Sequence, residues 1–270
     1  MKAVRKLFLI FFILFVLSIS HCLIDESIGQ TSQYTEKELR EKIRANPNDA
    51  EAHNNLGVLL SVLKRYVEEE KEYKEALSIN PNYVEAHNNL GNLLSVLKRY
   101  AEAEKEYKEA LRINPNYAGA HYNLGVLLSI LKRYEEAEKE YKEAIRINPN
   151  YAEAHYNLGN LLYDLKRQNE AEREYKEAIR INPNYAEAYY NLGLLLYDSK
   201  RYAKAEKEYK TAIKINPNLA EAHANLGLLY WATNKKDEAK KETLIAKELF
   251  EKEGRVEYVK KMDEWLKGLK

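Results

Sequence analysis

The sequence predicts an all-α solenoid of stacked helix pairs, and three observations favour this fold class. The tripeptide Asn-Pro-Asn occurs six times, first at residues 46–48, and every interval between copies is 34 residues. Between the copies, apolar residues recur at spacings typical of amphipathic helices. Glycine and proline number only 10 and 6 among 270 residues, so few residues interrupt these helices. A fixed period of this length indicates a repeat architecture.

Each 34-residue unit is expected to hold two helices. In the first complete unit, the first helix runs from about Glu51 to Lys64, where basic residues suit the negative end of the helix dipole. The second helix runs from about Val67 to Ile79. Pro81 then stops it, because proline cannot continue the backbone hydrogen-bond ladder. One helix pair cannot bury its apolar face alone, so stacked units should share a continuous core and a concave surface.

Small and large residues take fixed places within each unit. In the second unit they are the small residues Gly91, Ala103 and Ala110, the large residues Leu90, Leu94 and Tyr107, and the terminal Pro115. This pattern resembles the tetratricopeptide repeat family, and the resemblance covers residues 50–253 as six repeats. It implies a right-handed superhelical solenoid of antiparallel helix pairs, in which the first helices line the concave groove. The pattern lapses at Glu69, which replaces an alanine, and at Thr243 and Glu251 in the last unit.

Shorter segments flank the six units. Residues 25–34 are polar and are expected to be a linker. Residues 35–49 look like the second helix of a truncated unit, with Thr35 and Glu38 placed for a capping box. Residues 254–270 are expected to cap the last repeat, the alternative being a membrane-surface or partner helix. The apolar stripe of this helix is Val256, Val259, Met262, Trp265, Leu266 and Leu269.

Residues 1–24 have the layout of a signal peptide or an N-terminal membrane anchor. A basic start precedes the apolar run Leu7–Ile19, and small residues precede a possible cleavage after Ser20. The uncharged stretch that begins with this run extends from Leu7 to Ile24 and is 18 residues long. This length is at the short edge of what spans a bilayer. A lipid-modified Cys22 is a third alternative. These interpretations predict an extracytoplasmic protein, secreted or membrane-anchored; an anchor with repeats facing the cytoplasm is the alternative.

Charge and cysteine content argue against several function classes. The net charge is +1 and Lys and Glu are interleaved, so there is no basic surplus to hold nucleic acid. One cysteine excludes an intramolecular disulfide and a thiolate metal site. The recurring Asn-Leu-Gly segments lie inside predicted helices and lack the lysine of a phosphate loop. No room for a catalytic domain remains outside the repeats, so we expect neither enzymatic activity nor a cofactor.

A histidine recurs on the first helices at the 34-residue interval: His53, His87, His121, His155 and His223, with Tyr189 in the fifth unit. Metal ligation would require rings close enough for bonds near 2 Å, and copies on successive repeats should lie too far apart. The position is the large packing position of the resembled family. We therefore expect packing histidines and no metal site.

One groove position is asparagine in every unit: Asn55, Asn89, Asn123, Asn157, Asn191 and Asn225. A side-chain amide both donates and accepts, which matches a peptide backbone of any sequence. The repeats of the O-linked N-acetylglucosamine transferases look similar and carry such a ladder, and this resemblance implies binding of an extended peptide. The alternatives are amides that bond to neighbouring repeats, hydrate the groove, or are neutral copies.

Two neighbouring positions become aromatic along the chain. The first position reads, from the first unit to the last, Asn54, Asn88, Tyr122, Tyr156, Tyr190 and Ala224. The second position reads Ser61, Ser95, Ser129, Tyr163, Tyr197 and Trp231. Tyrosine and tryptophan dominate binding hot spots, so the later repeats are predicted to hold the anchor residues of a partner. The alternative is that some of these rings pack between repeats. By contrast, the second-helix tyrosines are predicted to be core: Tyr73, Tyr107, Tyr141, Tyr175 and Tyr209.

Acidic residues recur near the groove. They are Glu51, Glu85, Glu153, Glu187, Glu221, Asp164 and Asp198. Relatives that clamp a C-terminal carboxylate need cations near the groove, whereas these residues are acidic. A neutral or basic protein or peptide ligand is therefore favoured. The predicted function is a protein–protein interaction scaffold, an assembly or adaptor factor. The alternative is a non-catalytic subunit that recruits substrate for an enzyme encoded elsewhere.

Overall fold

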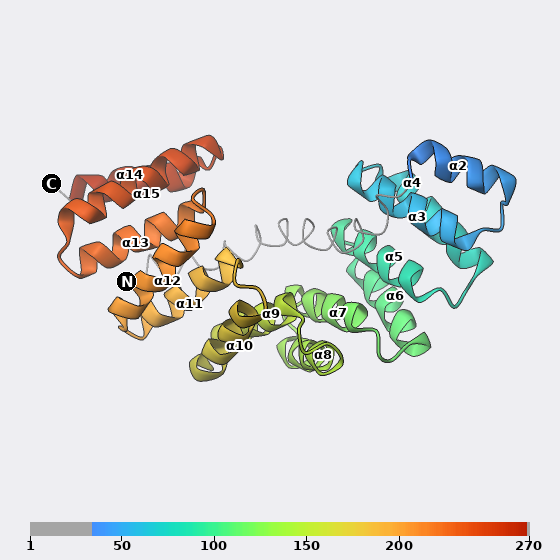
Figure 1. The fold of residues 1–270 in the computed structure, drawn as a ribbon, viewed down its shortest axis with the longest axis horizontal. Coiled ribbons are helices and arrows are strands. Elements are labelled where there is room, and N and C mark those ends of the chain that lie inside the picture. Colours follow the sequence, from blue (N-terminus) through green and yellow to red (C-terminus); the bar gives the residue numbers. More distant parts are fainter. Residues whose placement is uncertain (1–33, 269–270) are drawn as a thin grey trace. The chain divides into compact units, whose positions relative to one another are not determined.

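The computed structural model describes residues 34–268 (Figure 1). All the regular secondary structure within these residues is helical, as the sequence predicts. The predicted signal or anchor segment, Cys22 and nearly all of the linker lie outside the described residues. Among residues 34–268, no helix is both long enough and apolar enough to cross a membrane.

Six helix pairs follow one another within residues 34–268. The first helices are α3 (Ala50–Val62), α5 (Val84–Val96), α7 (Ala118–Ile130), α9 (Ala152–Asp164), α11 (Ala186–Asp198) and α13 (Ala220–Ala232). The second helices are α4 (Tyr66–Ile79), α6 (Tyr100–Ile113), α8 (Tyr134–Ile147), α10 (Gln168–Ile181), α12 (Tyr202–Ile215) and α14 (Lys236–Lys252). The helices that flank the pairs are α2 (Glu36–Ala45) and α15 (Val256–Gly268).

The described helices belong to two compact units. Unit 1 ends at Glu140 and unit 2 begins at Tyr141, so the division falls inside α8. Within unit 1, α3 packs on α4 and on α5, and α5 packs on α6 and on α7. Within unit 2, α11 packs on α9, α12 and α13, and α14 packs on α13 and α15. In both units, therefore, first helices lie beside first helices (Figure 1). The first helices that pack on their own second helix are α3, α5, α9, α11 and α13.

The core of a repeat is built where a second-helix tyrosine packs onto a first-helix glycine. Tyr107 is 2% exposed, and a Cβ added at Gly91 would lie only 2.6 Å from its ring. A Cβ added at Gly159 would likewise lie 2.8 Å from the ring of Tyr175. Any larger residue at these glycines would have to displace the tyrosine ring. The predicted core tyrosines are confirmed as buried: Tyr73, Tyr107, Tyr141, Tyr175 and Tyr209.

The first helix ends two residues earlier than predicted, at Val62, because Lys64 has a left-handed φ of 56°. The amides of Lys64 and Arg65 donate to the carbonyls of Ser61 and Leu60, which is the pattern of a Schellman C-cap. The other pairs also place a non-glycine residue at positive φ: Lys98, Lys132, Lys166, Lys200 and Asn234. This conformation costs a non-glycine residue about 1 kcal/mol.

A ladder of ion pairs joins neighbouring repeats, and the sequence analysis missed it. Arg65 donates to both carboxylate oxygens of Glu36 at 2.9 Å and holds Glu68 of its own repeat at 2.6 Å. Arg201 donates to Glu172 at 2.6 Å, and this hydrogen bond lowers the pKa of Glu172 to about 2. The described pairs of this ladder are Arg65–Glu36, Arg99–Glu70, Arg133–Glu104, Arg201–Glu172 and Lys235–Glu206. Each partner lies 29 residues earlier in the chain.

Both ends of the described chain carry the expected helices. Thr35 and Glu38 form the predicted capping box at the start of α2. In α15, Met262 of the predicted stripe is buried, but Val256 is 61% exposed. Tyr258, which the prediction omitted, is buried and stacks on Phe250 of α14 with ring centroids 5.0 Å apart. The face of α15 that packs on α14 is therefore slightly rotated from the predicted apolar stripe.

Glu69 is the one buried departure from the repeat pattern in α4. Its side chain takes the place of the alanine found at Ala103 and is only 3% exposed. Its Oε2 atom has no hydrogen-bond partner among the described residues. Burial raises the pKa of this carboxyl to about 8. The first repeat therefore contains a carboxyl group that is costly to ionise.

Candidate functional site

The asparagines of the first helices form hydrogen bonds from one repeat to the previous one. In unit 1, Asn89 donates to Asn54 at 3.0 Å and Asn123 donates to Asn88 at 2.9 Å. In unit 2, Asn225 donates to the Tyr190 hydroxyl at 2.7 Å. Each acceptor lies 35 residues earlier. These contacts agree with the predicted alternative in which the amides join neighbouring repeats.

The predicted ladder is also largely withdrawn from the surface. Asn123 and Asn157 are 5% and 7% exposed. Asn191 donates to the Tyr156 hydroxyl at 2.9 Å and to Asn160 at 2.8 Å. The half-buried members of the ladder are Asn55, Asn89, Asn191 and Asn225. A peptide on this face would meet amides whose donors are already partly used.

The rings at the position before each asparagine are buried. Tyr122, Tyr156 and Tyr190 are between 2% and 9% exposed. The ring of Tyr156 lies 4.8 Å from that of Tyr185, and the ring of Tyr190 lies 6.0 Å from that of Tyr209. Unlike the exposed anchors that the sequence analysis predicted, Tyr156 and Tyr190 pack between helices. The sequence could not separate these two roles, because both place a ring on the same side of a first helix.

The other predicted aromatic position is accessible. Trp231 is 40% exposed at the end of α13, and Tyr163 and Tyr197 are half-buried at the ends of α9 and α11. Tyr197 packs on Tyr202 with ring centroids 5.5 Å apart. The Tyr163 hydroxyl donates to Asp198 of the next repeat. These three rings recur at the same place in successive repeats of unit 2.

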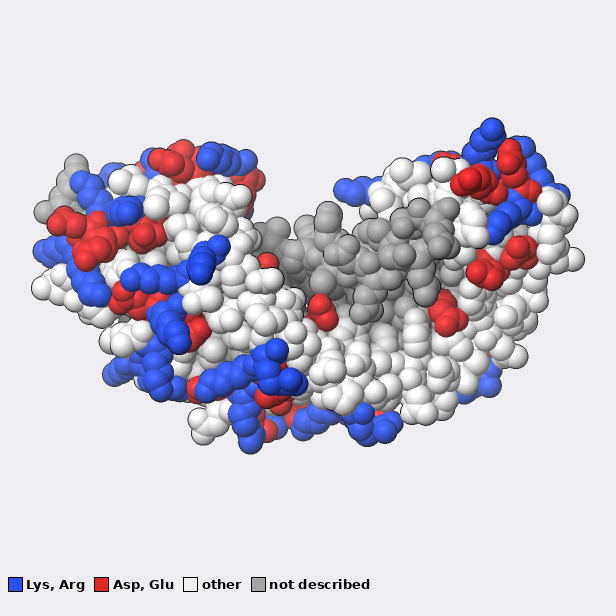
Figure 2. Space-filling model, in the orientation of Figure 1, with Lys and Arg blue, Asp and Glu red and all other residues white. Residues whose placement is uncertain are grey.

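The acidic residues near these rings do not all remain available. Asp164 and Asp198 are exposed next to Tyr163 and Tyr197, and Asp198 accepts a hydrogen bond from the Tyr163 hydroxyl. Glu221 instead accepts a hydrogen bond from Arg255, a cation that sequence reasoning missed. Figure 2 shows basic and acidic side chains intermixed on one face, beside broad uncharged areas.

The recurring histidines are held by two acceptors. In the second repeat, Nδ1 of His87 lies 2.6 Å from Glu106, and Nε2 lies 3.1 Å from the carbonyl of Pro81. A ring with an acceptor at both nitrogens is best satisfied when both nitrogens carry a proton. Burial alone would lower the pKa of His87, but the hydrogen bonds to Glu106 and Pro81 raise it. The same two contacts are made by His53, His121, His155 and His223.

These contacts agree with the packing role predicted for the histidines. Within residues 34–268, no group of three His, Cys, Asp or Glu side chains is arranged to hold a metal ion. Tyr189 takes the histidine position in the fifth repeat, and the carboxylate equivalent to Glu106 there is Glu208. Burial raises the pKa of Glu208.

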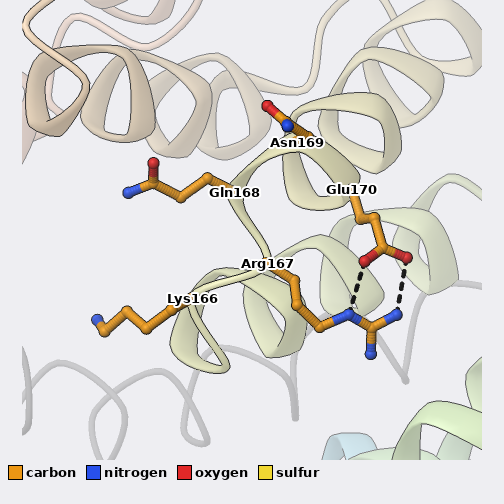
Figure 3. Close-up of a pocket in the computed structure, with 5 residues that line it drawn as sticks. All are labelled: Lys166, Arg167, Gln168, Asn169 and Glu170. Carbon is orange, nitrogen blue, oxygen red and sulfur yellow. Dashed lines mark hydrogen bonds and ion pairs between the residues drawn. The ribbon is translucent and has the colours of Figure 1, made fainter.

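A small hollow lies at the turn between α9 and α10. Its volume is about 310 Å³, and its walls are five consecutive residues, Lys166 to Glu170 (Figure 3). Arg167 and Glu170 form two hydrogen bonds of 2.7 Å on one side of it. The side chains of Lys166 and Gln168 extend to the other side (Figure 3). The sequence analysis did not single out these residues.

Comparison with protein families gives matches through most of the repeat region. Family models described as TPR repeat match residues 71–95, 130–166, 159–200 and 193–234. Models described as tetratricopeptide repeat match residues 84–117 and 106–139. No curated protein matches the chain.

Solved structures with similar folds include several repeat proteins. YrrB, described as a TPR protein with an unusual peptide-binding site, is 26% identical over 70% of this chain and 97% of its own, with a TM-score of 0.55. MamA is 28% identical over 62% of this chain and 97% of its own, with a TM-score of 0.57. PilF of Pseudomonas aeruginosa is 24% identical over 80% and 97%, with a TM-score of 0.71, and at that identity supports the fold alone.

Proposed function

We propose that this chain, which belongs to the tetratricopeptide-repeat family, binds an extended peptide or partner protein on the first-helix face of unit 2. Repeats of this family support a protein-interaction scaffold in general. The finer proposal is an assembly or adaptor factor that works by binding and not by catalysis. A peptide-binding site is described for YrrB, whose repeats are similar in fold and sequence.

The observation that carries this proposal is the row of accessible rings in unit 2. Tyr163, Tyr197 and Trp231 stand at equivalent ends of α9, α11 and α13. Large aromatic side chains give much contact area at low entropic cost, which makes them effective anchors. The asparagine ladder supports this face by holding neighbouring first helices together.

The charge of this face favours a neutral or basic partner. Asp164 and Asp198 are exposed beside the rings. Opposite charge on a partner would speed its association and select it against acidic competitors. We also propose an extracytoplasmic location, secreted or anchored through residues 1–24, on the basis of their basic and apolar sequence pattern.

The proposal is tested by cross-linked pull-down from native cells with the full-length chain as bait. One variant carries Tyr163→Ala, Tyr197→Ala and Trp231→Ala. A matched control carries Val62→Ala and Val96→Ala, which remove exposed apolar side chains from unit 1. A partner captured by the wild type and the control, but lost with the folded triple variant, supports the proposed face.

Capture that survives in the triple variant would contradict the proposed face. A third bait with Asn123, Asn157 and Asn191 changed to alanine separates the ladder from the rings. Circular dichroism of each bait must show intact helices, since Asn123 and Asn157 are buried. If the captured partner is a stoichiometric enzyme, the chain is a substrate-recruiting subunit and the adaptor role is revised.

A further inference from the structure

The turns between the first and second helices of the first two repeats expose aliphatic side chains. Val67 is 86% exposed, and four others are between 37% and 49% exposed: Val62, Leu63, Val96 and Leu97. We call these five residues the aliphatic edge. In unit 2, by contrast, the equivalents of Val62 and Val96 are the carboxylates Asp164 and Asp198. The aliphatic edge is therefore a feature of unit 1.

The two turns lie next to each other because the repeats are in register. The amide of Asn89 on α5 donates to Asn54 on α3 at 3.0 Å, which aligns the two first helices. Arg99, at the end of the second turn, donates to Glu70 of α4 at 2.8 Å, and Glu70 lies about one helical turn after Val67. The aliphatic side chains of two repeats therefore share one surface, and a contiguous exposed apolar surface marks an interaction site.

The charge left unpaired at this surface is positive. Glu68 and Glu102 each accept a hydrogen bond of 2.6 Å from the arginine of their own turn. Lys64 and Lys98 are exposed between the aliphatic side chains and the arginines. Neither lysine forms an ion pair with a described residue, since the arginines hold the carboxylates of these turns. The surface therefore combines aliphatic side chains with two free ammonium groups.

A bilayer with anionic headgroups fits this combination better than a protein surface does. Aliphatic side chains can enter the boundary between headgroups and acyl chains while ammonium groups stay at the phosphates. The hot spots of protein interfaces are instead enriched in tyrosine, tryptophan and arginine, and leucine and valine are under-represented there. A second copy of the same edge would place lysine against lysine, which is unfavourable.

Unit 1 is also the unit joined to the apolar N-terminal segment. Helix α2 follows the predicted linker and packs on α3. The ten residues of the linker, 25–34, can span at most about 36 Å. A membrane that holds the apolar stretch ending at Ile24 is therefore within reach of unit 1.

We propose that the aliphatic edge, together with Lys64 and Lys98, binds the surface of an anionic lipid membrane. This goes beyond the proposed function, because it gives unit 1 a lipid surface and uses none of the rings of unit 2. It relies on the proposed N-terminal anchor only to bring the membrane near, and the test reads the two separately.

The test places a fluorescent label on the full-length chain and adds vesicles of phosphatidylglycerol mixed with phosphatidylcholine. Cys22→Ser with Val67→Cys gives one labelling site on the aliphatic edge, and Cys22→Ser with Ala203→Cys gives the equivalent exposed site in unit 2. A nitrobenzoxadiazole label at position 67 should brighten and shift to the blue on the mixed vesicles, and much less on pure phosphatidylcholine. The label at position 203 should change on neither.

Charge reversal tests the role of the lysines in the chain labelled at position 67. Lys64→Glu with Lys98→Glu should weaken the membrane contact more than about tenfold, because each lysine near an anionic surface strengthens it about fivefold. Lys166→Glu with Lys200→Glu is the matched control, since these exposed lysines of unit 2 also have positive φ at the equivalent turns. The control should respond as the unsubstituted chain does. Circular dichroism checks that each variant is folded.

The proposal is overturned if the label at position 67 does not respond to the anionic vesicles, or if the label at position 203 responds equally. It is also overturned if both lipid compositions give the same response, or if reversal of Lys64 and Lys98 leaves the response unchanged. Flotation of the vesicles reports the N-terminal anchor by itself, so a chain that floats without a label response contradicts the aliphatic edge alone. A response to membrane-free cell extract, and not to vesicles, would assign this surface to a protein.

Discussion

The two units build the same ladder with different side chains. In unit 1 the acceptor of Asn123 is the amide of Asn88, whereas in unit 2 the acceptor of Asn225 is the hydroxyl of Tyr190. The ladder requires only an oxygen at this position. The ring of Tyr190 also fills the space beside Tyr209. An amide side chain at the same position is too short to fill it. One repeat framework can therefore support a polar first-helix face in unit 1 and a ring-rich one in unit 2.

The largest effect should come from removing the ring in unit 2. Tyr190→Ala deletes a buried ring and a ladder acceptor, and large-to-small changes of this kind cost about 3–5 kcal/mol. Asn88→Ala in unit 1 deletes only the acceptor and should cost about 1–2 kcal/mol. Repeat proteins need not unfold in one step, so the stability of each unit has to be measured separately. Hydrogen exchange does this. Equal losses in the two variants would contradict the difference drawn between the units.

The next effect concerns Glu69, which has alanine at its equivalents Ala171 and Ala205 in unit 2. Its folded pKa of about 8 lies above the ordinary value of 4.5. The folded state therefore holds the proton more tightly, and stability falls as the pH rises from about 4.5 to about 8. Glu69→Ala should stabilise unit 1 by roughly 1–3 kcal/mol above pH 8.

Urea unfolding of wild type and Glu69→Ala across this pH range measures that gain. Glu69→Gln keeps the size of the side chain and removes only its charge, so it should abolish the pH slope as well. A slope that persists unchanged in both variants would show that Glu69 is not its source.

Most of the fold could be predicted because its signals are local and repeated. The 34-residue interval, the stop at Pro81 and its equivalents, and the core tyrosines follow from spacing alone. The ladder of Arg65 with Glu36 was missed because it depends on the register between repeats, although the 29-residue offset is a signal that could have found it. Arg255, directly before α15, pairs with Glu221 of α13 in the last repeat, and no single-helix pattern contains that contact.

The candidate site was less predictable than the fold. Periodicity places Tyr190 and Trp231 on a first helix, but it does not say whether a neighbouring ring covers them. The covering ring of Tyr190 belongs to Tyr209 on the second helix, while Trp231 remains 40% exposed at its helix end. Exposure is therefore a property of the packed pair of helices and not of one sequence position.

A smaller effect should be shared by both units. Lys98 in unit 1 and Lys200 in unit 2 have φ values of 60° and 58° at the same turn. Glycine adopts this conformation without the steric cost, so Lys98→Gly and Lys200→Gly should each stabilise their unit by about 0.5–1 kcal/mol. Thermal melting with local hydrogen exchange measures both. A loss of stability in either variant would mean that the lysine side chain contributes more than its backbone strain costs.

The smallest effect sharpens the comparison within unit 2. Tyr189→His places in the fifth repeat the histidine that the other repeats carry at this position. In those repeats the histidine bonds a carboxylate of the second helix, as His155 does with Glu174 at 2.7 Å. Burial raises the pKa of Glu208 in the wild type, and the new donor should lower it. In the wild type, the raised pKa of Glu208 makes the folded protein less stable as the pH rises through that pKa. In the variant this loss of stability should be smaller. Carboxylate NMR of Glu208 gives the answer, and an unchanged pKa would show that the histidine does not reach it.

The central claim is that the accessible rings of unit 2 anchor a partner. Hydrogen exchange of the full chain with and without the captured partner tests it most directly, because it maps protection along the whole sequence. The account predicts new protection at the ends of α9, α11 and α13, around Tyr163, Tyr197 and Trp231. Protection confined to the second helices, or to unit 1, would contradict it.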